Sequence, residues 1–173
     1  MPDSLTGRVK ALARSLGFDL AGVTAAAPFE REEQAMAERV RAGLMDGLPW
    51  FTEARARLAC RPQELLPGAR SVIALGVAYY PGDFPSHGAD GTLRGRVSRY
   101  AWGRDYHHVL RRRLKAFVQA LPHLAPQGGV RARLFVDTGP LAERAAAVRA
   151  GVGWYGKNTN VLARNYGTWV FLA

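Results

Sequence analysis

The sequence is poor in cysteine and has no long apolar run. Its single cysteine, Cys60, excludes a disulfide within the chain and a cysteine-based metal cluster. No stretch approaches the ~20 apolar residues that a membrane-spanning helix needs. The N-terminus has neither the charged region nor the apolar region of a signal peptide. We therefore expect a cytoplasmic protein in a reducing compartment, with Cys60 buried as a small hydrophobe.

Lysine and the acidic residues are also scarce. Arginine outnumbers lysine 21 to 3, and with 14 acidic residues the net charge is +10. Eight basic residues and one acid, Asp105, lie between Arg94 and Lys115. Because phosphate contacts supply most nucleic-acid affinity, this cluster favours a polyanionic partner. The alternative is that an Ala- and Arg-rich composition reflects codon bias and leaves the arginines solvated.

The length fits one domain, residues 1–173, with a core of its own. Ala69–Tyr80 is the clearest strand, and it is apolar enough to be central in a sheet. Residues 43–67 are rich in turns, with Trp50 and Phe51 as expected anchors. Helices are predicted at 4–15, 28–42, 105–121 and 141–150, and further strands at 19–24, 130–136 and 168–172. This loose alternation indicates a layered α/β or α+β domain.

Asp137 follows a predicted strand and enters a Thr-Gly-Pro turn. An acid at a strand end is well held, lies close to solvent and can be buried by whatever ligand covers it, which suits a proton donor. Aspartate before Thr-Gly-Pro is equally ordinary turn chemistry. On the residues alone, both interpretations stay open.

The loop Gly151–Gly156 matches G-x-G-x-x-G and, extended to Lys157, most of a P-loop. Both nucleotide-binding motifs need a strand before the loop and a helix after it. Here the preceding residues are helical in pattern, and Asn158 stands where a P-loop has Ser or Thr. We interpret Gly151 as a helix C-terminal glycine. The loop can still bring backbone N–H groups and Lys157 to a polar ligand.

Asp105-Tyr106-His107 begins like D-x-H-x-x-G, a signature of cobalt-ligating histidine, but Leu110 stands where glycine is needed. We therefore interpret His107 and His108 as packing or surface residues. The segment 96–106 interleaves arginines with aromatics. These can pair with phosphates and stack on bases or on a flat cofactor, or the aromatics can pack as core.

Four segments in order resemble the N-terminal, cobalamin-binding domain of epoxyqueuosine reductases. They are Pro67–Ile73, Ser98–His107, Val136–Ala145 and Gly153–Thr159. The resemblance implies an α+β fold, a mixed sheet flanked by helices with a nitroreductase-like corrinoid-binding core. It also implies base-off cobalamin as cofactor and, as the reaction, reduction of epoxyqueuosine to queuosine in tRNA.

The resemblance also implies roles for individual residues. Asp137 would protonate the epoxide oxygen, which a carboxyl does near neutral pH only when burial disfavours its charged form. The residues implied to line the corrin are Arg99, Tyr100, Gly103, Asp105, Tyr106, Thr138, Gly139, Gly156, Lys157, Asn158 and Thr159. Those implied to face the tRNA anticodon stem-loop are Arg94, Arg96, Arg104, Arg111 and Arg112. No metal-ligating residue is implied.

Members of the family continue into a ferredoxin-like domain that holds two 4Fe-4S clusters, whereas this sequence has one cysteine. We therefore expect a chain truncated before that domain, or an iron–sulfur electron donor supplied by a partner. Two other functions stay open. One is a non-catalytic corrinoid- or tRNA-binding module, and the other is a flavin-dependent reductase.

Overall fold

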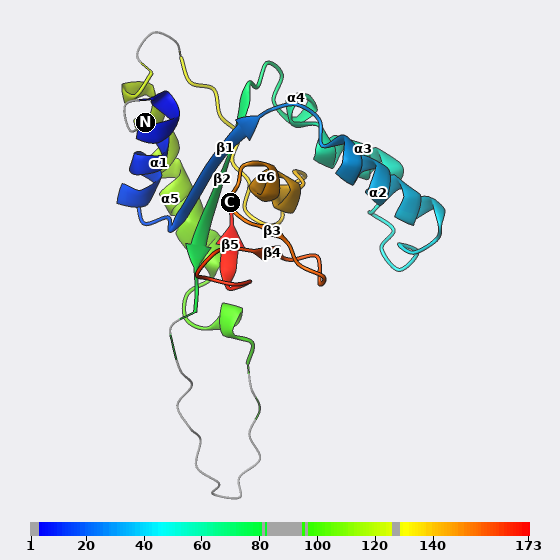
Figure 1. Cartoon of the computed structure of the whole chain (residues 1–173). Helices are drawn as coiled ribbons and strands as arrows, with labels where there is room; N and C mark the ends of the chain where they lie inside the picture. Colours follow the sequence, from blue (N-terminus) through cyan, green and yellow to red (C-terminus); the bar gives the residue numbers. More distant parts are fainter. Residues whose placement is uncertain (1–3, 81, 83–94, 96, 126–128) are drawn as a thin grey trace, which may run out of the picture.

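A three-stranded sheet lies between helices on both of its faces (Figure 1). The computed structural model describes residues 4–80, 82, 95, 97–125 and 129–173. The helices are α1 (Leu5–Ser15), α2 (Glu30–Arg41), α3 (Glu53–Cys60), α4 (Pro62–Leu65), α5 (Tyr106–Ala120) and α6 (Glu143–Arg149), with 3-10 turns η1 (Arg99–Ala101) and η2 (Leu121–His123). The strands are β1 (Leu20–Ala25), β2 (Ser71–Ala78), β3 (Trp154–Tyr155), β4 (Val161–Leu162) and β5 (Val170–Leu172).

Strand β2 is central, as its apolar run predicts, and the order is β1-β2-β5. The α+β class is confirmed. Every described strand pair is antiparallel, whereas the expectation was a mixed sheet. The pairing of Ala25 with Ser71 explains the direction of β2. The chain leaves β1 and re-enters β2 at the same end of the sheet, because α2, α3 and α4 form an excursion beyond that end (Figure 1).

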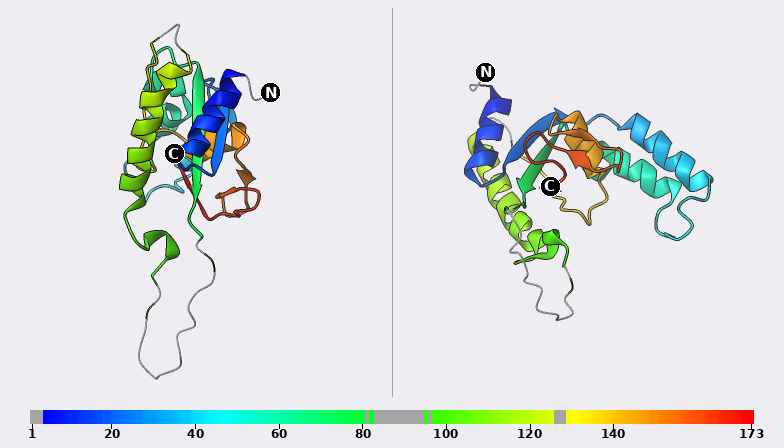
Figure 2. Two further views of the ribbon diagram at one scale, coloured as in Figure 1. Left: turned by 90° about the vertical axis from the view of Figure 1, so that its left-hand side faces the viewer. Right: turned by 60° about the horizontal axis from the view of Figure 1, so that its bottom comes forward.

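Consecutive residues of β2 point to opposite faces and so belong to two cores. Leu75 packs with α1 and α5 in a cluster that contains Phe18, Leu110, Leu114 and Phe117. The neighbouring Ala74 packs on the other face, with residues of α6 and of the segment that follows it (Ala147, Val152 and Val161). Figure 2 shows these layers from two further directions. The apolar stripe of α5, in which Leu110, Leu114 and Phe117 are buried, is therefore the face that covers the sheet.

Helices α2 and α3 form an arm beside the sheet (Figure 1). The arm packs on α6 through Phe29 and Cys60, which is fully buried. The prediction of a buried Cys60 is confirmed, and burial raises the pKa of its thiol to about 11. The prediction that Trp50 anchors the segment 43–67 is wrong, since its side chain is 60% exposed. Helix α3, which begins after its N-cap Thr52, was not predicted, because the glycines and proline of residues 43–49 indicated turns.

The strand predicted at 130–136 is wrong, because this segment pairs with no described strand. A cavity of about 610 Å³ lies between residues 129–135 and residues 71–75 of β2. A strand needs a hydrogen-bonded neighbour, and an alternating sequence pattern does not provide one. No helix among the described residues has the length and apolarity to cross a bilayer.

The Arg149 side chain fastens α6 to the segment between β1 and α2. Its guanidinium donates to the carbonyls of Ala25, Ala27 and Pro28 at 2.7–2.8 Å and lies 3.9 Å from the centre of the Phe29 ring. We expect Arg149→Ala to lower the free energy of unfolding by about 1–3 kcal/mol, because these carbonyls lose their donor. Urea denaturation measures the change. The control is Arg39→Ala, whose guanidinium donates to the Ala35 carbonyl within its own helix; it should change stability by less than about 0.5 kcal/mol. Equal losses in both variants would contradict the assignment.

A candidate active site around Asp137

Asp137 occupies a strained turn between the segment 129–136 and α6. Its φ is +56°, and the Thr138 N–H donates to the Val136 carbonyl at 2.6 Å across it, which makes a γ-turn. A non-glycine residue in this region costs free energy and persists only where its surroundings hold it. Such outliers cluster at functional sites, which makes the Asp137 turn a candidate for one.

Helix α3 supplies part of that hold. The Arg55 guanidinium donates to the Gly139 carbonyl at 3.0 Å, and the Ala142 N–H donates to the Ala59 carbonyl at 2.9 Å. On the inner side, a Cβ at Gly139 would collide with the Phe135 ring. The glycine of the Thr-Gly-Pro sequence is therefore required by close packing.

The carboxyl of Asp137 is 61% exposed and meets the first turn of α5. The Tyr106 hydroxyl donates to its Oδ2 at 2.7 Å, and the Nε2 of His107 lies 3.4 Å from the same oxygen. Stacking on Phe171, with ring centroids 4.1 Å apart, fixes the Tyr106 ring. Burial, and secondly the bond to Asp137, raise the pKa of Tyr106, so its hydroxyl stays a donor.

Asp105 orients the His107 ring. Its Oδ1 accepts from the His107 backbone N–H at 2.8 Å, as the N-cap of α5, and lies 2.9 Å from His107 Nδ1. These contacts, the backbone bond first, lower the pKa of Asp105. The expectation that His107 packs is confirmed by its stacking on Tyr106. The sequence motif does not indicate the place of His107 beside Asp137, because the two residues lie far apart in the chain and meet only in the folded structure.

A cavity of about 210 Å³ opens beside this group. Tyr79, Tyr106, Asp137, Glu143 and Arg144 lie on its wall with residues of the 160–172 segment. Burial raises the pKa of the Glu143 carboxyl to about 7. The sequence does not indicate this raised pKa, since Glu143 resembles an ordinary acid in the first turn of a helix.

The residues expected to line a cofactor fall into two groups. Thr138 and Gly139 share the Asp137 turn, and Asp105 and Tyr106 contact it at the start of α5. Gly156, Lys157, Asn158 and Thr159 form the turn between β3 and β4. Arg144 connects that turn to α6, with Nη1 3.3 Å from both oxygens of Thr159. The turn therefore adjoins the cavity through Arg144.

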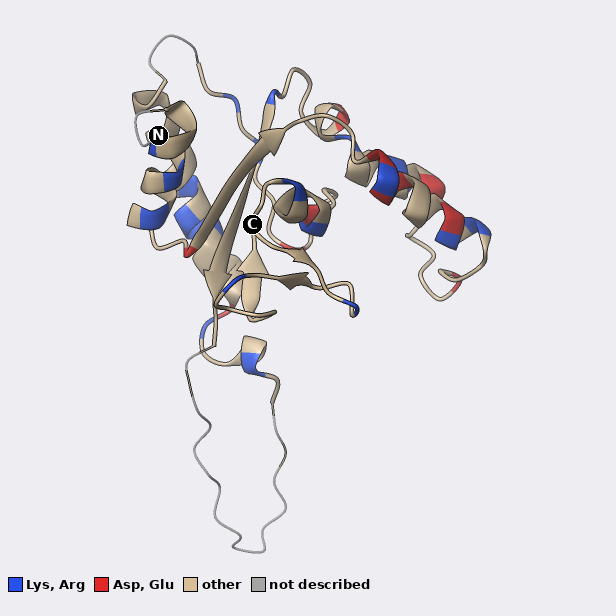
Figure 3. Ribbon diagram, viewed as in Figure 1, with Lys and Arg blue, Asp and Glu red and all other residues tan. Residues whose placement is uncertain are grey.

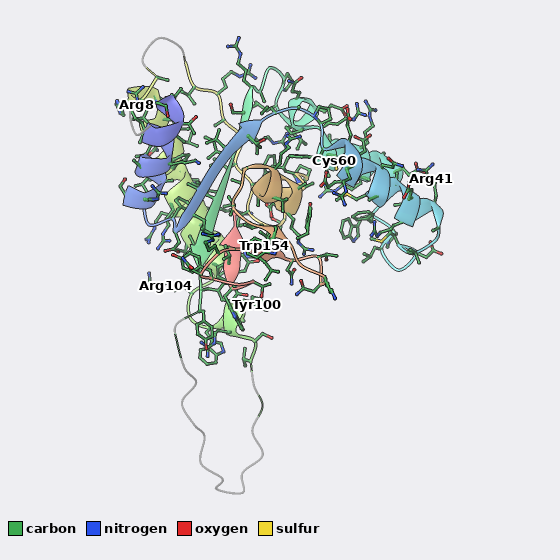
Figure 4. The ribbon with its side chains drawn as sticks, viewed as in Figure 1. Arg8, Arg41, Cys60, Tyr100, Arg104 and Trp154 are labelled. Atoms are coloured by element: carbon green, nitrogen blue, oxygen red, sulfur yellow. The ribbon has the colours of Figure 1, made fainter. Side chains whose placement is uncertain are left out.

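The segment before α5 adds an aromatic wall (Figure 4). Arg99 is buried, with its guanidinium 4.6 Å from the centre of the Tyr80 ring and 5.1 Å from that of Trp102, so it supports the wall from within. Tyr100 meets the Tyr106 ring edge-on, with centroids 6.5 Å apart. Gly103 has a φ of +81°, which favours glycine at this turn. Tyr80 also contacts Trp169, at 5.2 Å between centroids.

The basic residues are divided. Arg104, Arg111, Arg112 and Lys115 are exposed, and Arg111 reaches to 3.5 Å from the Thr138 hydroxyl. Arg113 instead donates to the Gly17 carbonyl. Arg94 and Arg96 lie outside the described residues. Figure 3 shows mixed charge on the α2–α3 arm and predominantly basic residues on α5. No group of three or more His, Cys, Asp or Glu in the described part of the chain is arranged to hold a metal ion.

Comparison with known proteins identifies relatives along nearly the whole chain. A family model described as "Epoxyqueuosine reductase QueG, DUF1730" matches residues 60–138. An epoxyqueuosine reductase from Synechocystis sp. is 42% identical over 147 residues, which cover 83% of this chain and 48% of the relative. The chain belongs to the epoxyqueuosine reductase family. It spans about half the length of the curated relatives it matches.

Solved structures of epoxyqueuosine reductases share the fold. One, described as carrying an epoxyqueuosine-modified tRNA stem loop, matches with a TM-score of 0.83 and 32% identity over 97% of this chain and 44% of its own. Another, from Bacillus subtilis, has a TM-score of 0.70 and 29% identity over 97% of this chain and 43% of its own. It is described as having a catalytic aspartate loop swung out of the active site.

Gly139→Ala tests whether close packing sets the Asp137 turn. We expect the added methyl group to push against Phe135, shift the turn and lower the free energy of unfolding by about 1–3 kcal/mol. Denaturation measures the loss, and the amide NMR signals of residues 136–139 report the shift. In the control Gly47→Ala, a Cβ meets no atom within 4 Å and both readouts should stay near wild type. Unchanged signals in Gly139→Ala would exclude the packing constraint.

Proposed function

We propose that this chain carries the catalytic site of an epoxyqueuosine reductase, which reduces epoxyqueuosine in tRNA to queuosine with Asp137 as proton donor to the epoxide oxygen. The observation that carries the proposal is the Asp137 turn itself. A solvent-facing carboxyl stands on a strained turn, hydrogen-bonded by Tyr106, in a family with a member described by its catalytic aspartate loop.

The reaction needs an acid at this place. Converting an epoxide to an alkene takes up two electrons and two protons, and the oxygen leaves as water. The oxygen becomes a poor leaving group if it stays an alkoxide, so a positioned acid accelerates the step. Tyr106 fixes the orientation of the Asp137 carboxyl, and the γ-turn presents it to a ligand that covers the exposed face.

The residues around Asp137 fit cobalamin, the flat and amide-rich cofactor that we propose here. Tyr80, Tyr100, Trp102 and Trp169 are 38–53% exposed. Tyr80 contacts Trp169, Trp102 shares the Arg99 guanidinium with Tyr80, and Tyr100 contacts Tyr106 beside Asp137. Exposed aromatic surface of this kind favours a covering partner. Thr138, Asn158, Thr159 and Lys157 would hydrogen-bond the amide groups at the rim. When bound, cobalamin would supply the redox chemistry, and its electrons would come from an iron–sulfur donor in the same polypeptide or in a partner.

The exposed arginines of α5 and of the turn before it suit the tRNA substrate. Arg104 and Arg112 are exposed, Arg111 lies 3.5 Å from the Thr138 hydroxyl in the Asp137 turn, and one solved relative is described as carrying a tRNA stem loop. Phosphate contacts from these residues would position the anticodon loop over the site. A tRNA substrate also agrees with the expected cytoplasmic location.

Asp137→Asn should retain cobalamin and lose turnover. We expect binding of cobalamin, read from its base-off absorption spectrum, to match wild type, and epoxyqueuosine reduction to fall about 10²–10⁴-fold when a chemical reductant supplies electrons. The control Asp46→Asn changes an exposed acid of the loop after α2 and should leave both unchanged. Retained turnover would remove the proton-donor role. Failure of the wild-type chain to bind cobalamin at micromolar protein would overturn the cofactor assignment, and a parallel flavin titration would then test the flavin alternative.

Arg104→Ala combined with Arg112→Ala should weaken binding of the tRNA stem loop. Two lost phosphate contacts should lower affinity and reduce the slope of log K against log salt by about 1.5–2. Fluorescence anisotropy over a salt series measures both. The pair Arg39→Ala and Arg57→Ala removes the same charge from the arm, and an equal effect there would show that only total charge matters.

A further inference from the structure

Glu143 is the acid of the site that the proposed chemistry leaves without a task. Its carboxyl lies at the start of α6, on the wall of the 210 Å³ cavity that Asp137 and Tyr106 share. Its Oε1 is enclosed and has no hydrogen-bond partner in the described part of the chain. An enclosed carboxylate oxygen without a partner is costly, whereas a protonated carboxyl is much less so. The surroundings therefore favour the neutral acid.

The groups around Glu143 pull in both directions. Burial has the largest effect and favours the neutral form, and the charge of Asp137 acts the same way. The backbone N–H of Asp137 and the charges of Arg144 and His107 favour the carboxylate. The titratable and charged groups that face it are Asp137 in the turn, Tyr106 and His107 of α5, Arg144 of α6 and Tyr79 after β2. Their balance leaves the pKa of Glu143 at about 7, where it exchanges a proton readily.

We propose that Glu143 is the proton reservoir of Asp137: it acts through Asp137, without touching the substrate, and returns a proton once Asp137 has given up its own. This inference rests on the proposed function. Protonated Asp137 transfers its proton to the epoxide oxygen and becomes a carboxylate. Protonated Glu143 then transfers its proton to that carboxylate, and Asp137 delivers this second proton to the hydroxyl that leaves as water. The two electrons would be supplied by the proposed donor and cofactor.

Asp137 and Glu143 line the same cavity, through which a proton can pass between them. The cavity is large enough for a bridging water, and its wall offers polar groups from Tyr79, Tyr106 and Arg144 to hold one. Solvent water then reprotonates Glu143 through the opening of this cavity. Glu143 thereby supplies the second proton of the reaction to Asp137 while a ligand covers the exposed side of Asp137.

The test compares turnover of wild type and Glu143→Gln across pH 5.5–8.5, with a chemical reductant and an epoxyqueuosine-modified stem loop. The reservoir is full below its pKa and empty above it, so wild-type turnover should fall as pH rises through about 7. At pH 6 the variant should be slower by about 10-fold or more, and at pH 8.5 the two rates should converge.

Two further variants control the result. Glu53→Gln changes an exposed acid at the start of α3 and should keep the wild-type profile. Glu143→Asp retains an acid, so it should preserve the pH dependence even where Glu143→Gln folds poorly. A rate deficit that is the same at every pH would assign Glu143 a structural role and overturn the proposal.

Infrared difference spectra of the full chain give a readout that needs no substrate. A protonated-carboxyl band that disappears in Glu143→Gln should titrate near pH 7, and in Asp137→Asn it should titrate at lower pH, because the repelling charge is gone. Absence of that band would overturn the reservoir even if turnover is normal. Absence of turnover in wild type, with the band intact, would instead overturn the proposed function, and the two failures are thus distinguishable.

Discussion

The hydrogen bond between Tyr106 and Asp137 joins the two sides of the molecule. Tyr106 begins α5, which covers one face of the sheet, and Asp137 precedes α6, which covers the other. The ring that makes this bond is itself stacked on Phe171 of β5. The start of α5, the strand β5 and the Asp137 turn therefore meet at the Tyr106 side chain. The position of the Asp137 carboxyl depends on the packing of all three.

The strain at Asp137 has a structural source that can be named. Arg55 and Ala59 hold the turn from α3, Phe135 packs under Gly139, and the Arg149 contacts keep α6 against the β1–α2 segment. The arm of α2 and α3 supports the turn through the contacts of Arg55 and Ala59, and it carries mixed charge unlike the basic face of α5 (Figure 3). The contribution of the arm is to hold the Asp137 turn in place through these hydrogen bonds.

The sequence predicts those parts of the structure that local chemistry determines. The buried stripe of α5, the central strand β2, the Gly151 terminus of α6 with its φ of +74° and the inert Cys60 each follow from periodicity, backbone preference or composition. Residues 130–136 have a strand pattern, but pairing is a tertiary property and the pattern cannot supply a neighbour. His107 and Glu143 were missed for a related reason. Their chemistry arises from groups 30 or more residues away or from burial, and neither is visible in the adjacent sequence.

The enclosed thiol of Cys60 gives this chain a property unrelated to its chemistry. It is the single cysteine of the sequence, it is fully buried, and its raised pKa keeps it as the unreactive thiol at neutral pH. Thiol-directed labels should therefore leave the unaltered protein unmodified. Two cysteines, one introduced on the exposed face of α5 and one on the β3–β4 turn, would carry spin or fluorescent probes on either side of the site. Cys60 would not have to be replaced first.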